Sequence, residues 1–98
     1  MKVQLNGTLM TDKAAAHDHI QKQLSFPAYF GRNLDALYDL LTSLPEMTEI
    51  ELTEKDAILE QLGAYGAALL VTLQQAEEDF LLLQKKSMQW DLNSVYIL

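Results

Sequence analysis

The most informative part of this chain reads Tyr29-Phe30-Gly31-Arg32-Asn33-Leu34-Asp35-Ala36-Leu37-Tyr38-Asp39-Leu40-Leu41-Thr42-Ser43-Leu44. Pro27 and Gly31 indicate a loop, and the Asn33 side chain can accept a hydrogen bond from the first turn of a helix. Nothing between Leu34 and Leu44 opposes helix formation. The sequence therefore predicts a helix over residues 33–44.

This helix is predicted to have two different faces. At about 100° per residue, one arc of roughly 120° carries only leucines and is expected to face the core. Its members are Leu34, Leu37, Leu40, Leu41 and Leu44. The opposite arc, roughly 100° wide, combines two carboxylates, a phenol and a hydroxyl. These outward residues are Asp35, Tyr38, Asp39 and Thr42.

The two aspartates on the outward face differ in their local environment. Asp35 lies in the first turn, where the helix dipole stabilises a carboxylate by about 0.3–1 kcal/mol. Asp39 lies four residues later, where two like charges cost about 0.2–0.5 kcal/mol. A solvated helix can carry this cost, so the residues alone leave two interpretations open. One is an ordinary polar surface, and the other is a small anionic site with aromatic residues at its edge.

The run that begins at Pro27 closely resembles the signature of the barstar family, small proteins that inhibit microbial ribonucleases of the barnase type. The family pattern is Pro, any residue, two aromatics, Gly, any residue, Asn-Leu-Asp-Ala-Leu, an aromatic and Asp. The chain reads Pro27-Ala28-Tyr29-Phe30-Gly31-Arg32-Asn33-Leu34-Asp35-Ala36-Leu37-Tyr38-Asp39. Weaker similarity at residues 3–7, at residues 74–76 and in the apolar C-terminal strand extends the resemblance to a single domain over residues 1–98.

The resemblance implies a cytoplasmic inhibitor of a basic, extracellular-type microbial ribonuclease. It implies that Asp39 reaches deepest into the nuclease site, that Asp35 supports it, and that Tyr29 packs against the catalytic base. The other predicted contacts surround these three. The complete predicted partner-binding set is Tyr29, Asn33, Asp35, Tyr38, Asp39, Thr42, Leu44 and Gln75.

Four positions depart from the usual family pattern. Tyr38 replaces a frequent Trp, Leu44 stands where an aromatic residue is common, and Gln75 replaces an acid. Arg32 adds a positive charge beside the acidic residues. These departures leave a second hypothesis open, in which the chain is an interaction or structural module of the same fold without inhibitor activity. Such a module is expected to self-associate through Phe80, Leu82, Leu83 and Trp90.

Composition limits the possible functions. The 98 residues suit one domain. The net charge of −7 disfavours nucleic acid as the partner and favours a basic protein. The chain is expected to be a monomer rather than a homo-oligomer. No apolar run of about 18 residues suggests a membrane span, and the N-terminus lacks a signal sequence, which predicts a cytoplasmic protein. The absence of Cys excludes disulfides and thiolate chemistry.

No motif predicts an enzyme, a cofactor or a metal site. His17 and His19 point about 200° apart on a helix and cannot share one ion, so one is expected on the surface and the other nearer the core. Asp35 and Asp39 lie on an exposed face without a cleft that would raise either pKa, which disfavours acid–base catalysis. The acids at residues 77–79 are typical of a solvated helix face.

Apolar periodicity predicts the remaining elements. Strands are expected at residues 2–5, 47–52 and 93–98, and helices at residues 12–24, 33–44, 53–62 and from residue 64 onward. Thr53 is expected to open the third helix and Gly63 to end it. Strands separated by helices favour parallel pairing. The sequence and the resemblance both predict an α/β fold in which a three-stranded parallel sheet packs with about four helices.

Overall fold

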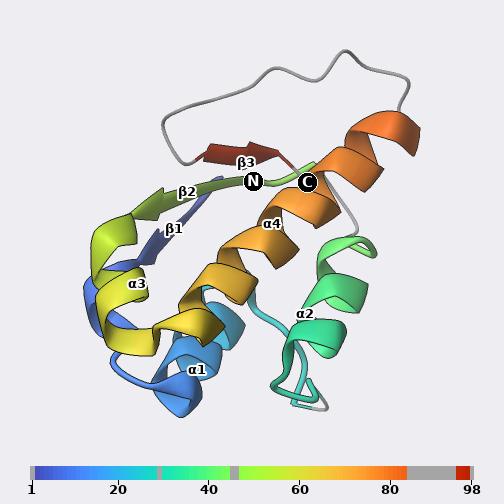
Figure 1. Ribbon diagram of the computed structural model, residues 1–98. Helices are drawn as coiled ribbons and strands as arrows, with labels where there is room; N and C mark the ends of the chain where they lie inside the picture. The colour runs from blue at the N-terminus through green and yellow to red at the C-terminus, as the bar shows by residue number, and fades with distance from the viewer. Residues whose placement is uncertain (1, 29, 45–46, 84–94, 98) are drawn as a thin grey trace.

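The computed structural model describes residues 2–28, 30–44, 47–83 and 95–97, which form an α/β fold of two layers. Figure 1 shows α1, α2 and α4 on one side of the sheet, with α3 beyond the end of β2. The elements in chain order are β1 (Lys2–Asn6), the short 3₁₀ helix η1 (Gly7–Leu9), α1 (Lys13–Leu24), α2 (Leu34–Leu41), β2 (Glu49–Thr53), α3 (Lys55–Leu62), α4 (Ala64–Leu83) and β3 (Val95–Ile97).

The strands β1 and β2 pair in parallel, as predicted, with Val3 opposite Ile50 and Leu5 opposite Leu52. All four of these side chains are buried, whereas the residues between them face away from the helices. Strands that alternate in this way bury one face and leave the other polar. The buried face of the sheet therefore supplies one wall of the core.

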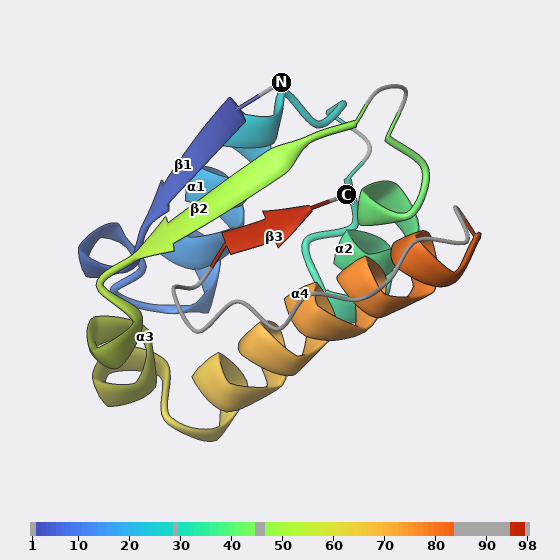
Figure 2. The same cartoon turned by 90° about the horizontal axis from the view of Figure 1, so that it is seen from above.

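The third strand runs in the other direction. β3 pairs antiparallel with β2, with Glu49 opposite Ile97 and Glu51 opposite Val95, and Figure 2 shows its arrow pointing opposite to that of β2. The prediction of a fully parallel sheet is wrong for this strand. A β-branched and aromatic run identifies a strand but carries no direction, which depends on where the preceding chain enters the sheet. Asn93, Ser94 and Leu98 lie outside the described residues.

The helices cover the sheet through apolar side chains spaced by three or four residues. In α1 the Asp12 side chain accepts a hydrogen bond from the Ala15 amide at 2.7 Å, and Ser25 in the left-handed region ends the helix. In α4 the fully buried residues Leu69, Leu73 and Ala76 repeat at the predicted spacing. The described core consists of Val3, Leu5, Met10, Ala16, Ile20, Leu24, Phe26, Phe30, Leu37, Leu41, Ile50, Leu52, Ile58, Leu69, Leu73 and Ala76.

Several element boundaries differ from the sequence prediction, among them the start of β2, which is Glu49 and not Met47. Thr53 is the last residue of β2 and its hydroxyl donates to the Leu5 carbonyl at 3.3 Å, while Glu54, at φ 57°, precedes α3 without a side-chain cap. The helix α2 ends at Leu41, three residues early. The Thr42 and Ser43 hydroxyls donate to the last carbonyl groups of this helix, and such bonds compete with continued helical pairing. Gly63, at φ 59°, ends α3 as predicted.

None of the helices in the described ranges combines the length and apolar character that a membrane crossing requires. Within the same ranges, no three His, Cys, Asp or Glu side chains lie close enough together to hold a metal ion.

Candidate protein-binding site

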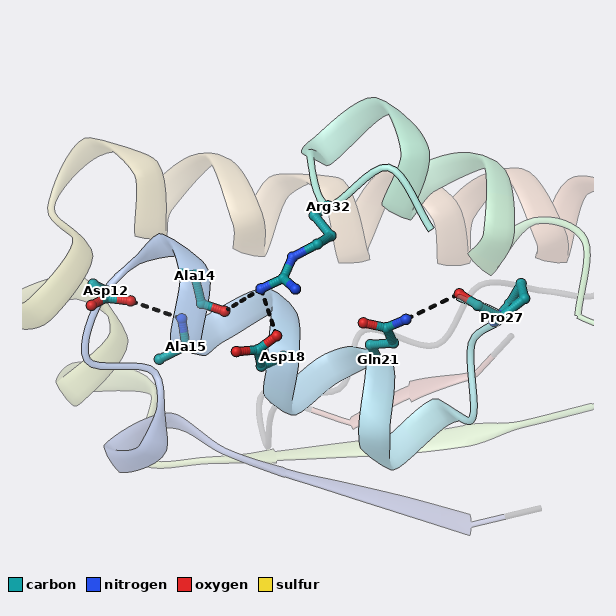
Figure 3. Close-up of polar contacts among 7 residues, drawn as sticks. All are labelled: Asp12, Ala14, Ala15, Asp18, Gln21, Pro27 and Arg32. Carbon is teal, nitrogen blue, oxygen red and sulfur yellow. Dashed lines mark hydrogen bonds and ion pairs between the residues drawn. The ribbon is translucent and has the colours of Figure 1, made fainter. Parts of the chain in front are cut away.

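The loop before α2 is held against α1. Phe26 and Phe30 are buried with ring centroids 5.3 Å apart, and the Phe30 amide donates to the Pro27 carbonyl at 3.0 Å. The Gln21 side chain of α1 donates to the same carbonyl at 3.0 Å, as Figure 3 shows. The loop therefore has fixed contacts on both its apolar and its polar side. Tyr29, a predicted contact residue within it, lies outside the described residues.

Arg32 ties the end of this loop to α1. Its guanidinium lies 2.5 Å from the Asp18 carboxylate and donates to the Ala14 carbonyl at 3.2 Å (Figure 3). The backbone of Arg32 lies in the left-handed region, at φ 56°, which is costly for a residue with a side chain. The two contacts with α1 help to offset this cost. The Asp18 carboxylate also partly neutralises the positive charge of Arg32, which reduces the electrostatic repulsion between Arg32 and a basic partner.

Asn33 caps α2 as the sequence predicts. Its side-chain oxygen accepts a hydrogen bond from the Ala36 amide at 2.8 Å, and its side-chain nitrogen donates to the Gly31 carbonyl at 3.3 Å. Both ends of the amide are therefore used within the chain. This cap sets the direction in which α2 leaves the loop. A direct contact of Asn33 with a partner stays a prediction.

The helix α2 is anchored on one side and open on the other. Leu37 and Leu41 are buried, whereas Asp35, Asp39 and Thr42 are exposed and together form a surface that we call the acidic face. Within the described part of the chain, neither aspartate carboxylate has a hydrogen-bond or ion-pair partner. The two carboxylates, one turn apart on an anchored helix, are thus available to cationic groups of another molecule.

The other leucines of the predicted apolar stripe lie at its margins. Leu34, Leu40 and Leu44 are half-buried and pack against the core. Leu44 was also predicted as a partner contact, and its partial exposure leaves that prediction open.

Tyr38 connects α2 with α4. Its hydroxyl donates a hydrogen bond to the Asp79 carboxylate, whose other oxygen accepts from the Gln75 side chain at 3.2 Å. The hydrogen bond with Asp79 is the largest cause that raises the pKa of Tyr38, and burial and the Asp39 charge add to it. Two predicted site residues, Tyr38 and Gln75, therefore meet at a third residue.

Asp79 is not among the site residues predicted from the sequence, because the adjacent acids at residues 77–79 are typical of a solvated helix face. The four-residue spacing between Gln75 and Asp79 does indicate that both residues lie on the same side of α4. That α4 would pack beside α2 could be known only from the tertiary structure.

The two histidines of α1 have different surroundings. The buried His17 ring shares a hydrogen bond with the Tyr65 hydroxyl. It also packs edge-to-face with Phe30, and the two ring centroids are 5.7 Å apart. The half-buried His19 accepts a hydrogen bond from the Asn6 amide at 2.9 Å. His17 therefore supports the loop before α2 from beneath, whereas His19 joins α1 to β1.

We expect the free energy of unfolding to decrease as the pH falls below about 6.5. Burial lowers the pKa of His17 below its ordinary value of 6.5, and the Arg32 charge adds to the effect while Asp18 opposes it. The unfolded chain then binds the proton more readily, so the stabilisation is complete above pH 6.5 and is lost on acidification. Urea unfolding between pH 7.5 and 5 measures this slope.

The variant His17→Gln should show a shallower slope than the wild type over the same pH range. Burial also lowers the pKa of His19, so His19 contributes to the same pH dependence. His19→Gln is the matched comparison, because it removes the contribution of His19 and keeps that of His17. An unchanged slope in His17→Gln would contradict the assignment.

One hollow in the described part of the chain lies away from the acidic face. This hollow of about 430 Å³ is lined by Lys2, Val3, Gln4, Gln23 and Glu51, none of which belongs to the predicted site. Asp35, Asp39 and Thr42 are exposed, so the acidic face is accessible to the surface of another protein.

Similarity to known proteins shows which family this chain belongs to. The protein family described as Barstar (barnase inhibitor) matches residues 1–92. The chain is also similar to a protein of Bacillus subtilis (strain 168) named "Putative ribonuclease inhibitor YrdF", with 34% identity over 80 residues. That alignment covers 80% of this chain and 87% of the relative. The chain belongs to the barstar family.

Proposed function

We propose that this protein inhibits a basic microbial ribonuclease by placing the acidic face of α2 in its active site. The observation that carries the proposal is the pair of exposed carboxylates of Asp35 and Asp39, which have no partner among the described residues and lie on a helix whose opposite side is buried. Membership of a family described as barnase inhibitors supports a ribonuclease as the partner. The fixed loop before α2 supports binding with little loss of conformational entropy.

The proposed mechanism is imitation of the RNA phosphate. A ribonuclease holds the phosphate with Arg, Lys and His side chains, and a carboxylate can accept charge-assisted hydrogen bonds from the same donors. Asp39 is proposed to enter the active site, with Asp35 beside it and the aromatic residues at the margin. Occupied donors can no longer bind RNA, so the protein blocks the enzyme without chemistry of its own. The proposed place of action is the cytoplasm.

The test is inhibition of purified basic ribonucleases of the barnase type. We expect RNA cleavage to stop at one inhibitor per enzyme, with calorimetry giving the same stoichiometry. Glu60→Ala, which removes an exposed acid from α3, should inhibit as the wild type does. Full RNA cleavage in the presence of excess wild-type protein, for every ribonuclease tested, would contradict the proposal.

Association is expected to become slower as salt is added. The net charge of −7 attracts a basic partner over long distances, and dissolved ions screen this attraction. Stopped-flow measurement of the association rate between about 50 and 500 mM salt tests the expectation, because the Debye length falls severalfold over this range. The dissociation rate should change less. A salt-independent association rate would contradict steering by charge.

A further inference from the structure

The contact between α2 and α4 contains a polar arrangement that the family comparison does not assign. One carboxylate, that of Asp79, accepts from the Tyr38 hydroxyl with one oxygen and from the Gln75 side-chain amide with the other. Gln75 and Asp79 lie one turn apart on α4, whereas Tyr38 lies on α2 between Asp35 and Asp39. We call these three residues the Tyr38 clamp.

The clamp limits what Tyr38 can do at the surface. The ring of Tyr38 is half-buried and packs against the core, so the bond at its far end fixes the remaining freedom of the side chain. The hydroxyl proton is donated to Asp79, and this hydrogen bond is the largest cause that raises the pKa of Tyr38. The hydroxyl oxygen retains a lone pair and can therefore accept but not donate.

We propose that Asp79 is a positioning residue, which holds Tyr38 so that its hydroxyl presents only a hydrogen-bond acceptor beside the acidic face. This inference rests on the proposed function, and it specifies the partner. The enzyme must offer donors, such as guanidinium, ammonium or backbone amide groups, where it meets Tyr38 as well as where it meets Asp35 and Asp39. A partner with a carboxylate or carbonyl oxygen at this position is disfavoured, because two acceptors would face each other.

A double-mutant cycle separates positioning from direct contact. The four proteins are the wild type, Tyr38→Phe, Asp79→Ala and the double variant, each titrated with a ribonuclease that the wild type inhibits. Asp79→Ala should weaken binding by about three- to tenfold when Tyr38 is present, since coupled neighbours typically interact to this extent. The same change should have less than about a twofold effect in the Tyr38→Phe background. Equal losses in both backgrounds would overturn the proposal, because they indicate that Asp79 contacts the enzyme directly.

Two further variants distinguish geometry from charge. Asp79→Asn keeps a side-chain oxygen that can accept from Tyr38, so it should recover most of the affinity lost in Asp79→Ala. Glu78→Ala removes the same charge from the neighbouring position of α4 and should leave the affinity nearly unchanged. If Asp79→Asn binds as weakly as Asp79→Ala, the charge of Asp79 and not its position is what matters, and the proposal fails.

A measurement on the free protein keeps this inference separable from the proposed function. The titration of Tyr38 is followed by NMR, and Asp79→Ala should lower its pKa toward the ordinary value of 10.0. An unchanged Tyr38 pKa would show that Asp79 does not hold the Tyr38 hydroxyl, even if the wild type inhibits a ribonuclease. If the pKa falls but no ribonuclease is bound, the clamp exists and the proposed function is what fails, together with the role of Asp79 in binding.

Discussion

Asp39→Ala is expected to weaken the affinity for the ribonuclease by about 3 kcal/mol, which is more than a hundredfold in Kd. The reason is that the complex removes water from the basic groups of the enzyme, and the variant leaves them without their counter-charge. Calorimetry, or enzyme inhibition where binding is too tight for calorimetry, measures the change. Asp35→Ala should have a smaller effect, since Asp35 is proposed to support Asp39 at the margin of the active site.

The Asp39→Ala substitution should leave the folded protein intact. Asp39 is exposed, and its charge lies one turn from that of Asp35, so its removal relieves a repulsion of about 0.2–0.5 kcal/mol. The free energy of unfolding of Asp39→Ala should therefore equal or slightly exceed that of the wild type. Glu60→Ala provides the matched control for loss of one negative charge. If Asp39→Ala and Glu60→Ala bind the enzyme equally well, the acidic face is not the binding surface.

Leu37→Ala is expected to lower the free energy of unfolding by about 3 kcal/mol. The Leu37 side chain is 0% exposed and anchors α2 directly beneath the acidic face. Its truncation loses buried apolar surface and leaves a cavity that the surrounding helices fill only in part. Urea denaturation followed by circular dichroism measures the loss. The expected loss is a large share of the 5–15 kcal/mol by which a typical domain is stable.

Leu40→Ala is the matched control for the anchoring of α2. Leu40 lies on the same helix and packs against the same core but is only half-buried, so its truncation should cost clearly less. Equal losses in the two variants would contradict the described orientation of α2.

The Tyr38 clamp adds a second requirement that a partner enzyme must meet. Asp35 and Asp39 attract a basic group, but many basic surfaces satisfy that requirement. A fixed Tyr38 that only accepts hydrogen bonds requires a donor of the enzyme at one further position. Selectivity among related ribonucleases should therefore decrease in Tyr38→Phe even where affinity is retained. A panel of enzymes titrated with this variant measures the difference.

Local sequence chemistry was sufficient for the central part of the site. Asn33 predicts its own capping bond, and the spacing of the leucines predicts which side of α2 is buried and hence which side presents Asp35 and Asp39. The Barstar resemblance, confirmed over residues 1–92, rests on the same residues. These features depend on neighbours within about four residues, which is the range over which helical periodicity and capping act.

Boundaries with competing signals were harder to predict. Thr53 is a suitable helix cap by residue type, yet it lies in β2 and donates to Leu5 of the neighbouring strand. The helix α2 was predicted to continue to Leu44, but hydroxyl groups in the next turn occupy its last carbonyls. In both cases the residue type allowed two local outcomes, since Thr also favours strands and Ser and Thr hydroxyls can compete with helical hydrogen bonds.

The sequence by itself determined that this chain forms an α/β domain whose second helix is capped at Asn33 and carries two outward aspartates. It also determined the family, because the signature residues are contiguous. Only the tertiary structure decided that β3 runs antiparallel to β2, that Arg32 is paired with Asp18, and that Asp79 holds Tyr38. Periodicity reports which face of an element is apolar, whereas strand direction and contacts between distant side chains depend on how the elements pack.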